Sequence, residues 1–109
     1  MYEILIVGGG PAGLTAAIYA ARAGKHVAVL ERGSTGGQII SAPLVENYPG
    51  IPSVSGTELA RQMTEQACTF GAEIVYTEAV GLEKTPAGFW VLCMDGVREA
   101  KAVILATGA

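Results

Sequence analysis

The residues of this chain best suited to chemistry form a glycine-rich turn, Gly8-Gly9-Gly10-Pro11-Ala12-Gly13. Gly8 allows a sharp turn, and Gly10 has no Cβ to keep the backbone away from a pyrophosphate. Pro11 lacks an N–H group, which suits the first position of a helix whose other free N–H groups and positive dipole end would face the phosphates. The pattern is typical of a dinucleotide-binding site.

A strand and a helix are expected on either side of this turn. Residues 2–7 are mostly apolar and predict a strand. Residues 11–23 are mostly small and predict a helix, and residues 27–31 predict a second strand. Gly13 would let helix and strand touch closely, and Gly24 is expected to end the helix in a left-handed conformation. A glycine-rich turn of an ordinary α/β protein without a ligand is the alternative interpretation.

Glu31 ends the second predicted strand, where a carboxylate can accept hydrogen bonds from adenosine ribose hydroxyls. Its negative charge would repel the 2′-phosphate of NADP, although the neighbouring Arg32 could attract one. The residues therefore favour FAD or NAD over NADP at this site.

Composition sets limits on the class of protein. The chain has 109 residues, half of them hydrophobic, and this length predicts a single hydrophobic core. Its formal net charge of −3 argues against a nucleic-acid partner. Glycines and Pro11 interrupt the uncharged run of residues 4–21, so a membrane span is not expected. Glu3 stands where a signal peptide would carry basic residues, and we expect a cytoplasmic chain.

The sequence suggests neither a catalytic residue nor a metal site. Cys68 and Cys93 lie far apart in sequence without CxxC or metal-ligand spacing, so we interpret them as reduced structural thiols. His26 lies between Gly24 and the second strand and is interpreted as a solvated turn residue.

The remainder of the chain predicts a loop, a helix and several strands. Residues 32–52 show neither helical nor strand periodicity and predict a long functional loop. The next segment begins with the capping pattern Ser55 to Glu58, and a helix is expected to bury Leu59, Met63, Ala67 and Phe70.

The residues after this helix predict strands of both a parallel sheet and an antiparallel meander. Residues 73–76 predict a short strand, and residues 79–84, 89–94 and 97–100 predict an antiparallel meander with Trp90 packed under it. Residues 102–106 predict a last strand, apolar throughout and covered on both faces. The expected fold is α/β: a Rossmann-like parallel sheet with helices plus a three-stranded antiparallel meander.

Four segments together resemble the successive FAD-contacting motifs of low-molecular-weight thioredoxin reductases: residues 8–13, 36–38 (Gly-Gly-Gln), 46–50 (Glu-Asn-Tyr-Pro-Gly) and 106–109 (Ala-Thr-Gly-Ala). The second and third do not belong to NAD dehydrogenases, so the resemblance favours FAD over NAD. It implies that the cofactor-binding residues are Gly8, Gly10, Pro11, Ala12, Gly13, Glu31, Gly37, Gln38, Asn47, Ala79, Val80, Ala106, Thr107 and Gly108.

The resemblance also assigns roles to these residues. It implies that Gly8, Gly10, Pro11, Ala12 and Gly13 lie along the pyrophosphate. It also implies that Glu31 binds the adenosine ribose. Residues 37–38 and Asn47 would lie beside the ribityl chain and the isoalloxazine ring. The backbone of Ala79 or Val80 would meet the adenine, and Thr107 and Gly108 would close over the cofactor.

In the resembled family, the Ala-Thr-Gly-Ala motif leads into an NADPH-binding domain with a redox CxxC, and a late Gly-Asp segment returns to complete the FAD site. This sequence holds neither. We therefore expect residues 1–109 to form the first segment of a discontinuous FAD-binding domain, incomplete at its C-terminus and inactive on its own.

For the parent protein, the resemblance implies an FAD-dependent disulfide reductase of the thioredoxin reductase type. NADPH would reduce FAD, and FAD would reduce a disulfide in the missing domain. Thioredoxin or a similar disulfide protein is the expected partner, and a homodimer is compatible with the resemblance. Two alternatives stay open: a ferredoxin–NADP reductase of the thioredoxin reductase type, and a nucleotide-binding module without catalysis of its own.

Overall fold

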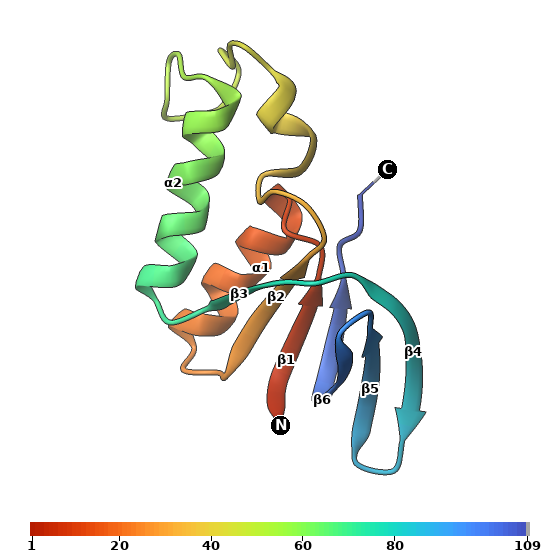
Figure 1. The fold of residues 1–109 in the computed structure, drawn as a ribbon. Helices are drawn as coiled ribbons and strands as arrows, with labels where there is room; N and C mark the ends of the chain where they lie inside the picture. Colours follow the sequence, from red (N-terminus) through yellow and green to blue (C-terminus); the bar gives the residue numbers. More distant parts are fainter. Residues whose placement is uncertain (109) are drawn as a thin grey trace.

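Parallel and antiparallel strands share one six-stranded sheet in the computed structural model, which describes residues 1–108 (Figure 1). The strand order is β3-β2-β1-β6-β5-β4; β3, β2, β1 and β6 run parallel, whereas β6, β5 and β4 are antiparallel. The predicted α/β fold is thereby confirmed. In chain order the elements are β1 (Tyr2–Val7), α1 (Pro11–Arg22), β2 (Val27–Glu31), the 3₁₀ helix η1 (Gly37–Ser41), α2 (Gly56–Thr69), β3 (Glu73–Tyr76), β4 (Ala79–Thr85), β5 (Gly88–Cys93) and β6 (Gly96–Leu105).

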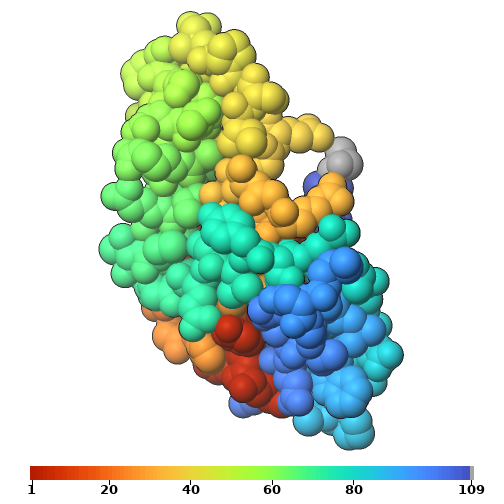
Figure 2. All heavy atoms as spheres, in the orientation of Figure 1, coloured from red at the N-terminus to blue at the C-terminus, as the bar shows by residue number. Residues whose placement is uncertain are grey.

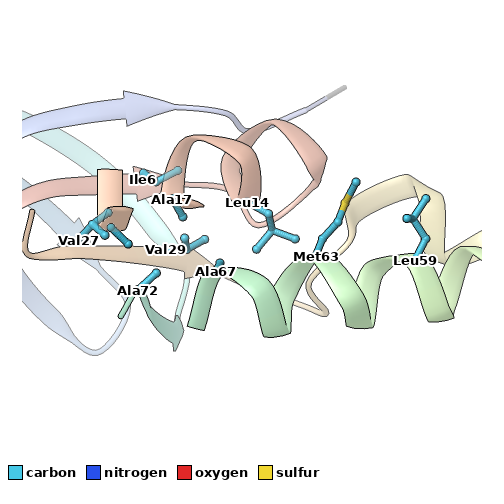
Figure 3. Close-up of a cluster of buried hydrophobic side chains, with 10 residues drawn as sticks. Ile6, Leu14, Ala17, Val27, Val29, Leu59, Met63, Ala67 and Ala72 are labelled. Carbon is cyan, nitrogen blue, oxygen red and sulfur yellow. The ribbon is translucent and has the colours of Figure 1, made fainter. Parts of the chain in front are cut away.

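Both α-helices cover the same face of the parallel strands. Ile6 of β1 and Val29 of β2 are fully buried against Leu14 of α1, and Ala67 brings α2 into the same core (Figure 3). Small residues such as Ala17 let α1 lie close to the sheet, because a larger side chain would push the two apart. This packing fixes where α1 begins relative to the ends of β1 and β2.

The antiparallel strands cover the opposite face. Leu5 of β1 and Leu30 of β2 are buried in a second core together with Val91 and Cys93 of β5 and Ala100 of β6. The connection from β3 to β4 crosses the parallel strands to reach this side (Figure 1). The sheet therefore bends strongly along β6, which belongs to both parts.

One long strand replaces two that the sequence predicted. Residues 97–100 and 102–106 were expected to be separate, but β6 runs without a break from Gly96 to Leu105. Its first half pairs antiparallel with β5, with Phe89 opposite Ala100, and its second half pairs parallel with β1, with Leu5 opposite Val103. Residues 97–105 contain no glycine, proline or asparagine, so the sequence offers no turn there.

The expectation that the last strand is covered on both faces is wrong for the described residues. Leu105 is 66% exposed and Ile104 is 37% exposed. The helices explain this, because α1 packs on β1 and β2 while α2 packs on α1 and η1.

Trp90 is a second correction, since its side chain is 42% exposed and does not pack under the meander. It lies opposite Glu83 on one side and Glu99 on the other, so it shares a face with charged residues that stay hydrated. The neighbouring Val91 takes the buried position instead, because successive residues of a strand point to opposite faces.

The two helices begin and end largely as predicted. The Ser55 hydroxyl accepts a hydrogen bond of 3.1 Å from the Glu58 N–H group, which confirms the predicted cap, and Gly24 has a φ of +79° after α1. Phe70 departs from the prediction: it is exposed, and the Arg22 guanidinium lies 5.5 Å from its ring centroid. Among residues 1–108, no helix combines the length and apolar character needed to cross a membrane.

The long loop contains local secondary structure that the sequence did not predict. It contains η1, and its later part closes through an antiparallel bridge between Val45 and Val54. The Val45 N–H group donates to the Val54 carbonyl over 2.7 Å. The loop is therefore folded against α2, where Ile39 and Val54 join the helix-side core.

Candidate functional site: a cleft at the carboxyl ends of the parallel strands

A cleft of about 750 Å³ opens where β1, β2 and β6 end. Figure 2 shows the surface hollowed between the orange loop that follows β2 and the blue end of the described chain. The chain leaves β1 through α1 toward β2 on one side, while β6 pairs with β1 on the other side. A crevice at the carboxyl ends of such parallel strands is where open α/β sheets bind ligands. The predicted residues that line the cleft are Gly8, Gly10, Pro11, Ala12, Glu31, Gly37, Gln38, Ala79, Ala106, Thr107 and Gly108.

At two positions of the first turn, contacts within the protein leave no room for a side chain and so require glycine. Gly8 has a φ of +111°, and a Cβ there would collide with the carbonyl group of Ala106. A Cβ at Gly13 would collide with the carbonyl group of Gly8. These contacts hold the start of α1 against β1 and β6 and leave no freedom to shift it.

Gly10 is different, because the surrounding protein leaves room for a side chain. An ideal Cβ at this position would lie 3.7 Å from the nearest atom, the Cα of Gly37, which is an ordinary contact. Gly10 also lines the cleft. The bare backbone here is therefore not required by contacts within the chain, and it leaves room for a group such as a pyrophosphate to approach closely.

The N-terminus of α1 faces this cleft. Pro11 occupies the first helical position, and the first hydrogen bond within the helix runs from the Leu14 N–H group to the Gly10 carbonyl over 2.9 Å. The N–H groups of Ala12 and Gly13 precede that bond, and the first turn is uncharged. The positive end of the helix dipole and these donors suit an anionic group.

A second glycine turn locks onto the first. The Gly36 N–H group donates to the Gly9 carbonyl over 2.7 Å, and a Cβ at Gly37 would lie only 3.1 Å from the Gly10 Cα. Gly36 has a φ of +106° and rests on Ala60 of α2, with which a Cβ would collide. The sequence predicted Gly37 in the site but not this contact between the turns, because it depends on how α2 packs.

Glu31 holds two backbone segments at the rim of the cleft. Its Oε1 accepts a 2.8 Å hydrogen bond from the Gly9 N–H group, and its Oε2 accepts a 2.7 Å bond from the Gly33 N–H group. A carboxylate has about four acceptor positions, so two such bonds leave capacity for ribose hydroxyls. Glu31 therefore both orders the glycine turn and presents acceptors to the cleft.

Several lining residues were missed by sequence reasoning: Val7, Gly9, Leu30, Arg32, Thr77 and Glu78. Thr77 and Glu78 carried a usable signal, because they directly follow β3, whose carboxyl end lies at the same edge of the sheet. The Thr77 N–H group donates to the Glu31 carbonyl over 3.0 Å, which sets this connection beside Glu31.

Three predicted residues do not line the cleft. Gly13 is buried under the turn, Asn47 is exposed in the loop after η1, and Val80 is 58% exposed on β4. Val80 points away because the strand alternates, and the preceding Ala79 faces the cleft instead. Ala109, the last residue of the Ala-Thr-Gly-Ala motif, lies outside the described residues.

The geometry matches a known family of proteins. The profile of the pyridine nucleotide-disulphide oxidoreductase family matches residues 2–109. The chain belongs to this family. The thioredoxin reductase of Treponema pallidum is 44% identical over 109 residues, which are 99% of this chain and 36% of that protein.

Solved structures of the family agree. The thioredoxin reductases of Streptococcus pyogenes (47% identity) and Lactococcus lactis (38% identity) each superpose with a TM-score of 0.96, covering all of this chain and 36% of theirs. The chain thus spans about a third of the relatives it matches. That third is the FAD-binding part of these oxidoreductases, which confirms the predicted family and cofactor.

Proposed function

We propose that this chain holds FAD in the cleft at the ends of β1, β2 and β6, within a thioredoxin reductase-type oxidoreductase. The observation that carries the proposal is Gly10: the protein leaves space for a side chain there, yet the backbone is bare, at the N-terminus of α1 and inside the cleft. A closely bound pyrophosphate accounts for both features.

Different residues of the cleft bind different parts of the cofactor in this proposal. Gly10 and Ala12 hold the pyrophosphate with backbone N–H groups and the dipole of α1, and Gly8 provides the sharp turn that places them there. Glu31 accepts hydrogen bonds from the adenosine ribose, and Ala79 lies beside the adenine. The resemblance supports placing Gln38 and Asn47 beside the ribityl chain and the ring, with Val80 near the adenine and Thr107 closing the site.

When bound, FAD supplies two-electron transfer between a nicotinamide and a disulfide. The chain's own contribution is to bind and orient the cofactor, because the roles proposed for its residues all concern binding. NADPH as reductant and thioredoxin as acceptor are proposals for the whole protein, supported by the relatives' names. The same names favour this reading over a ferredoxin–NADP reductase and over a non-catalytic module.

Three further expectations belong to the proposal. The exposed Ile104 and Leu105 on β6 support a discontinuous domain, because another segment of the protein would cover them. The free thiols of Cys68 and Cys93 support a reducing, cytoplasmic location. Homodimer formation is proposed from the resemblance.

The proposal is tested by titrating the purified chain with FAD and following the flavin fluorescence. We expect saturable binding, and weaker binding of FMN, which lacks the adenosine and the pyrophosphate. Equal affinity for FAD and FMN would contradict the role of the α1 N-terminus. Absence of FAD binding under conditions in which the chain is folded would contradict the proposed function.

A further inference from the structure

The turn between β5 and β6 reaches across to the connection between β3 and β4. The Thr77 hydroxyl donates to the Asp95 Oδ1 over 2.7 Å, and the Met94 N–H group donates to the Glu78 carbonyl over 2.9 Å. Asp95 lies in the tight turn between β5 and β6, and these contacts give its carboxylate a role beyond that turn.

Arg98 fixes the carboxylate that Thr77 meets. Its guanidinium donates to both oxygens of Asp95, over 2.8 Å to Oδ1 and 3.1 Å to Oδ2. Such a two-point contact sets the orientation of the carboxylate as well as its position. The hydrogen bonds from Arg98, and then that from Thr77, hold the pKa of Asp95 well below its usual range, so the acceptor stays ionised.

The far end of this contact is a wall of the cleft. Thr77, Glu78 and Ala79 line the cleft, whereas Asp95 and Arg98 do not. The Thr77 N–H group is bonded to the Glu31 carbonyl, so the wall lies beside the residue proposed to bind the ribose. The pairing of β4 with β5 shifts register between Ala79 and Gly81, so the regular ladder restrains the strand less just beyond the wall.

We propose that Asp95 is a positioning residue for the adenosine half of the cofactor: together with Arg98 it fixes Thr77, and thereby the wall formed by Thr77, Glu78 and Ala79. The inference rests on the proposed function, because it assumes that the cleft binds an adenine dinucleotide. Asp95 acts from outside the cleft, through the threonine hydroxyl.

The test compares the affinities of the chain for ADP and for FAD in a set of variants. Thr77→Val removes the hydroxyl at nearly constant shape, Thr77→Ser restores it, and Asp95→Ala removes the acceptor. Because one hydrogen bond is at stake, Thr77→Val and Asp95→Ala should each weaken both ligands about three- to tenfold. Thr77→Ser should bind as the unaltered chain does, and Glu58→Gln, which breaks a comparable ion pair on α2, should have no effect.

The double variant Thr77→Val/Asp95→Ala decides between positioning and separate roles. If Thr77 and Asp95 act through the same hydrogen bond, removing both should cost no more affinity for ADP or FAD than the more damaging of the two single substitutions. Unchanged affinity in Asp95→Ala, or losses that multiply in the double variant, would overturn the inference.

Thermal unfolding of each variant shows that it is folded during the titration. If Asp95→Ala does not fold, the comparison of Thr77→Val with Thr77→Ser decides, and equal affinities of these two would overturn the inference. Failure of the unaltered chain to bind either ligand would contradict the proposed function instead, and this inference with it.

Discussion

The two ends of the parallel strands use different chemistry. At the carboxyl ends, the cleft presents mainly backbone groups around Gly10. At the opposite end lies a cluster of side chains, in which the Tyr2 hydroxyl donates to Glu73 over 2.8 Å and the Tyr2 ring centroid lies 4.6 Å from that of His26. The Glu3 carboxylate accepts a hydrogen bond from the backbone N–H group of His26 over 2.9 Å.

This difference shows what each end can tolerate. A site built from backbone depends on the absence of side chains at a few positions, so single added atoms should disrupt it. A cluster of exposed side chains sits in water, which screens its charges, so losing one member should cost little. Variants at the two ends should therefore differ in how strongly they affect FAD binding.

The largest effect is expected for Gly10→Val. The branched side chain would occupy the space where the pyrophosphate should approach the backbone, and we expect FAD affinity to fall by about a hundredfold or more, equivalent to roughly 3 kcal/mol. Gly10→Ala should fold like the unaltered chain and lose less affinity, since its Cβ makes ordinary contacts. Titration with FAD and thermal unfolding provide the two measurements, and undiminished affinity in Gly10→Val would refute this role of the turn.

Removal of the Glu31 carboxylate should have the next largest effect. Glu31→Ala loses the ribose acceptors and frees the N–H groups of Gly9 and Gly33, so we expect FAD to bind about ten- to a hundredfold more weakly. Glu31→Gln should also bind more weakly, because its NH₂ group would face a backbone donor. Glu73→Gln makes the same change at the opposite end of the strands and is the control. If the Glu31 variants bind FAD as tightly as the unaltered chain and Glu73→Gln do, Glu31 does not contribute to FAD binding.

A smaller effect, on stability alone, is expected for Tyr2→Phe. The variant loses the hydrogen bond to Glu73 at an exposed site, which should lower the free energy of unfolding by at most about 1 kcal/mol. Denaturant unfolding measures this change. FAD affinity should stay unchanged, and a clear loss of affinity would mean that the two ends are coupled through the sheet.

The smallest effect concerns the pH dependence contributed by Glu58 on α2. Hydrogen bonds from Arg61, and then from Gln62, lower the pKa of Glu58 from 4.5 to about 2. Because the folded pKa is depressed, the stabilisation is present above pH 4.5 and is lost as the pH falls toward 2. Melting temperatures of Glu58→Gln should therefore change less across this window than those of the unaltered chain, with Glu83→Gln as the charge-matched control. If the melting temperatures of Glu58→Gln and the unaltered chain change equally with pH, the interactions of Glu58 are not the source of this pH dependence.

The sequence predicted the features that depend on neighbours in the chain. The turn at Gly8, the start of α1 at Pro11 and the position of Glu31 at the end of β2 follow from local pattern, and all three proved correct. The contact of Gly37 with Gly10 could not be predicted in this way, because it depends on how α2 packs.

The antiparallel part of the sheet was harder to predict for a related reason. Trp90 and Val91 are both apolar, so the pattern did not say which of them faces the core. The bond between Thr77 and Asp95 continues the antiparallel register of β4 and β5, in which Ala79 lies opposite Cys93, and the sequence did not predict that register. Contacts between distant segments were therefore the main source of error, whereas element types were largely correct.

We propose that backbone groups at the carboxyl ends of the strands hold the cofactor. Amide chemical shifts of the isotopically labelled chain, recorded by NMR during titration with FAD, test this most directly. We expect the largest changes at the backbone N–H groups of Gly10, Ala12 and Gly13, with those of Glu3 and His26 unchanged. Largest changes at the opposite end of the strands, or shifts spread evenly over the chain, would contradict it.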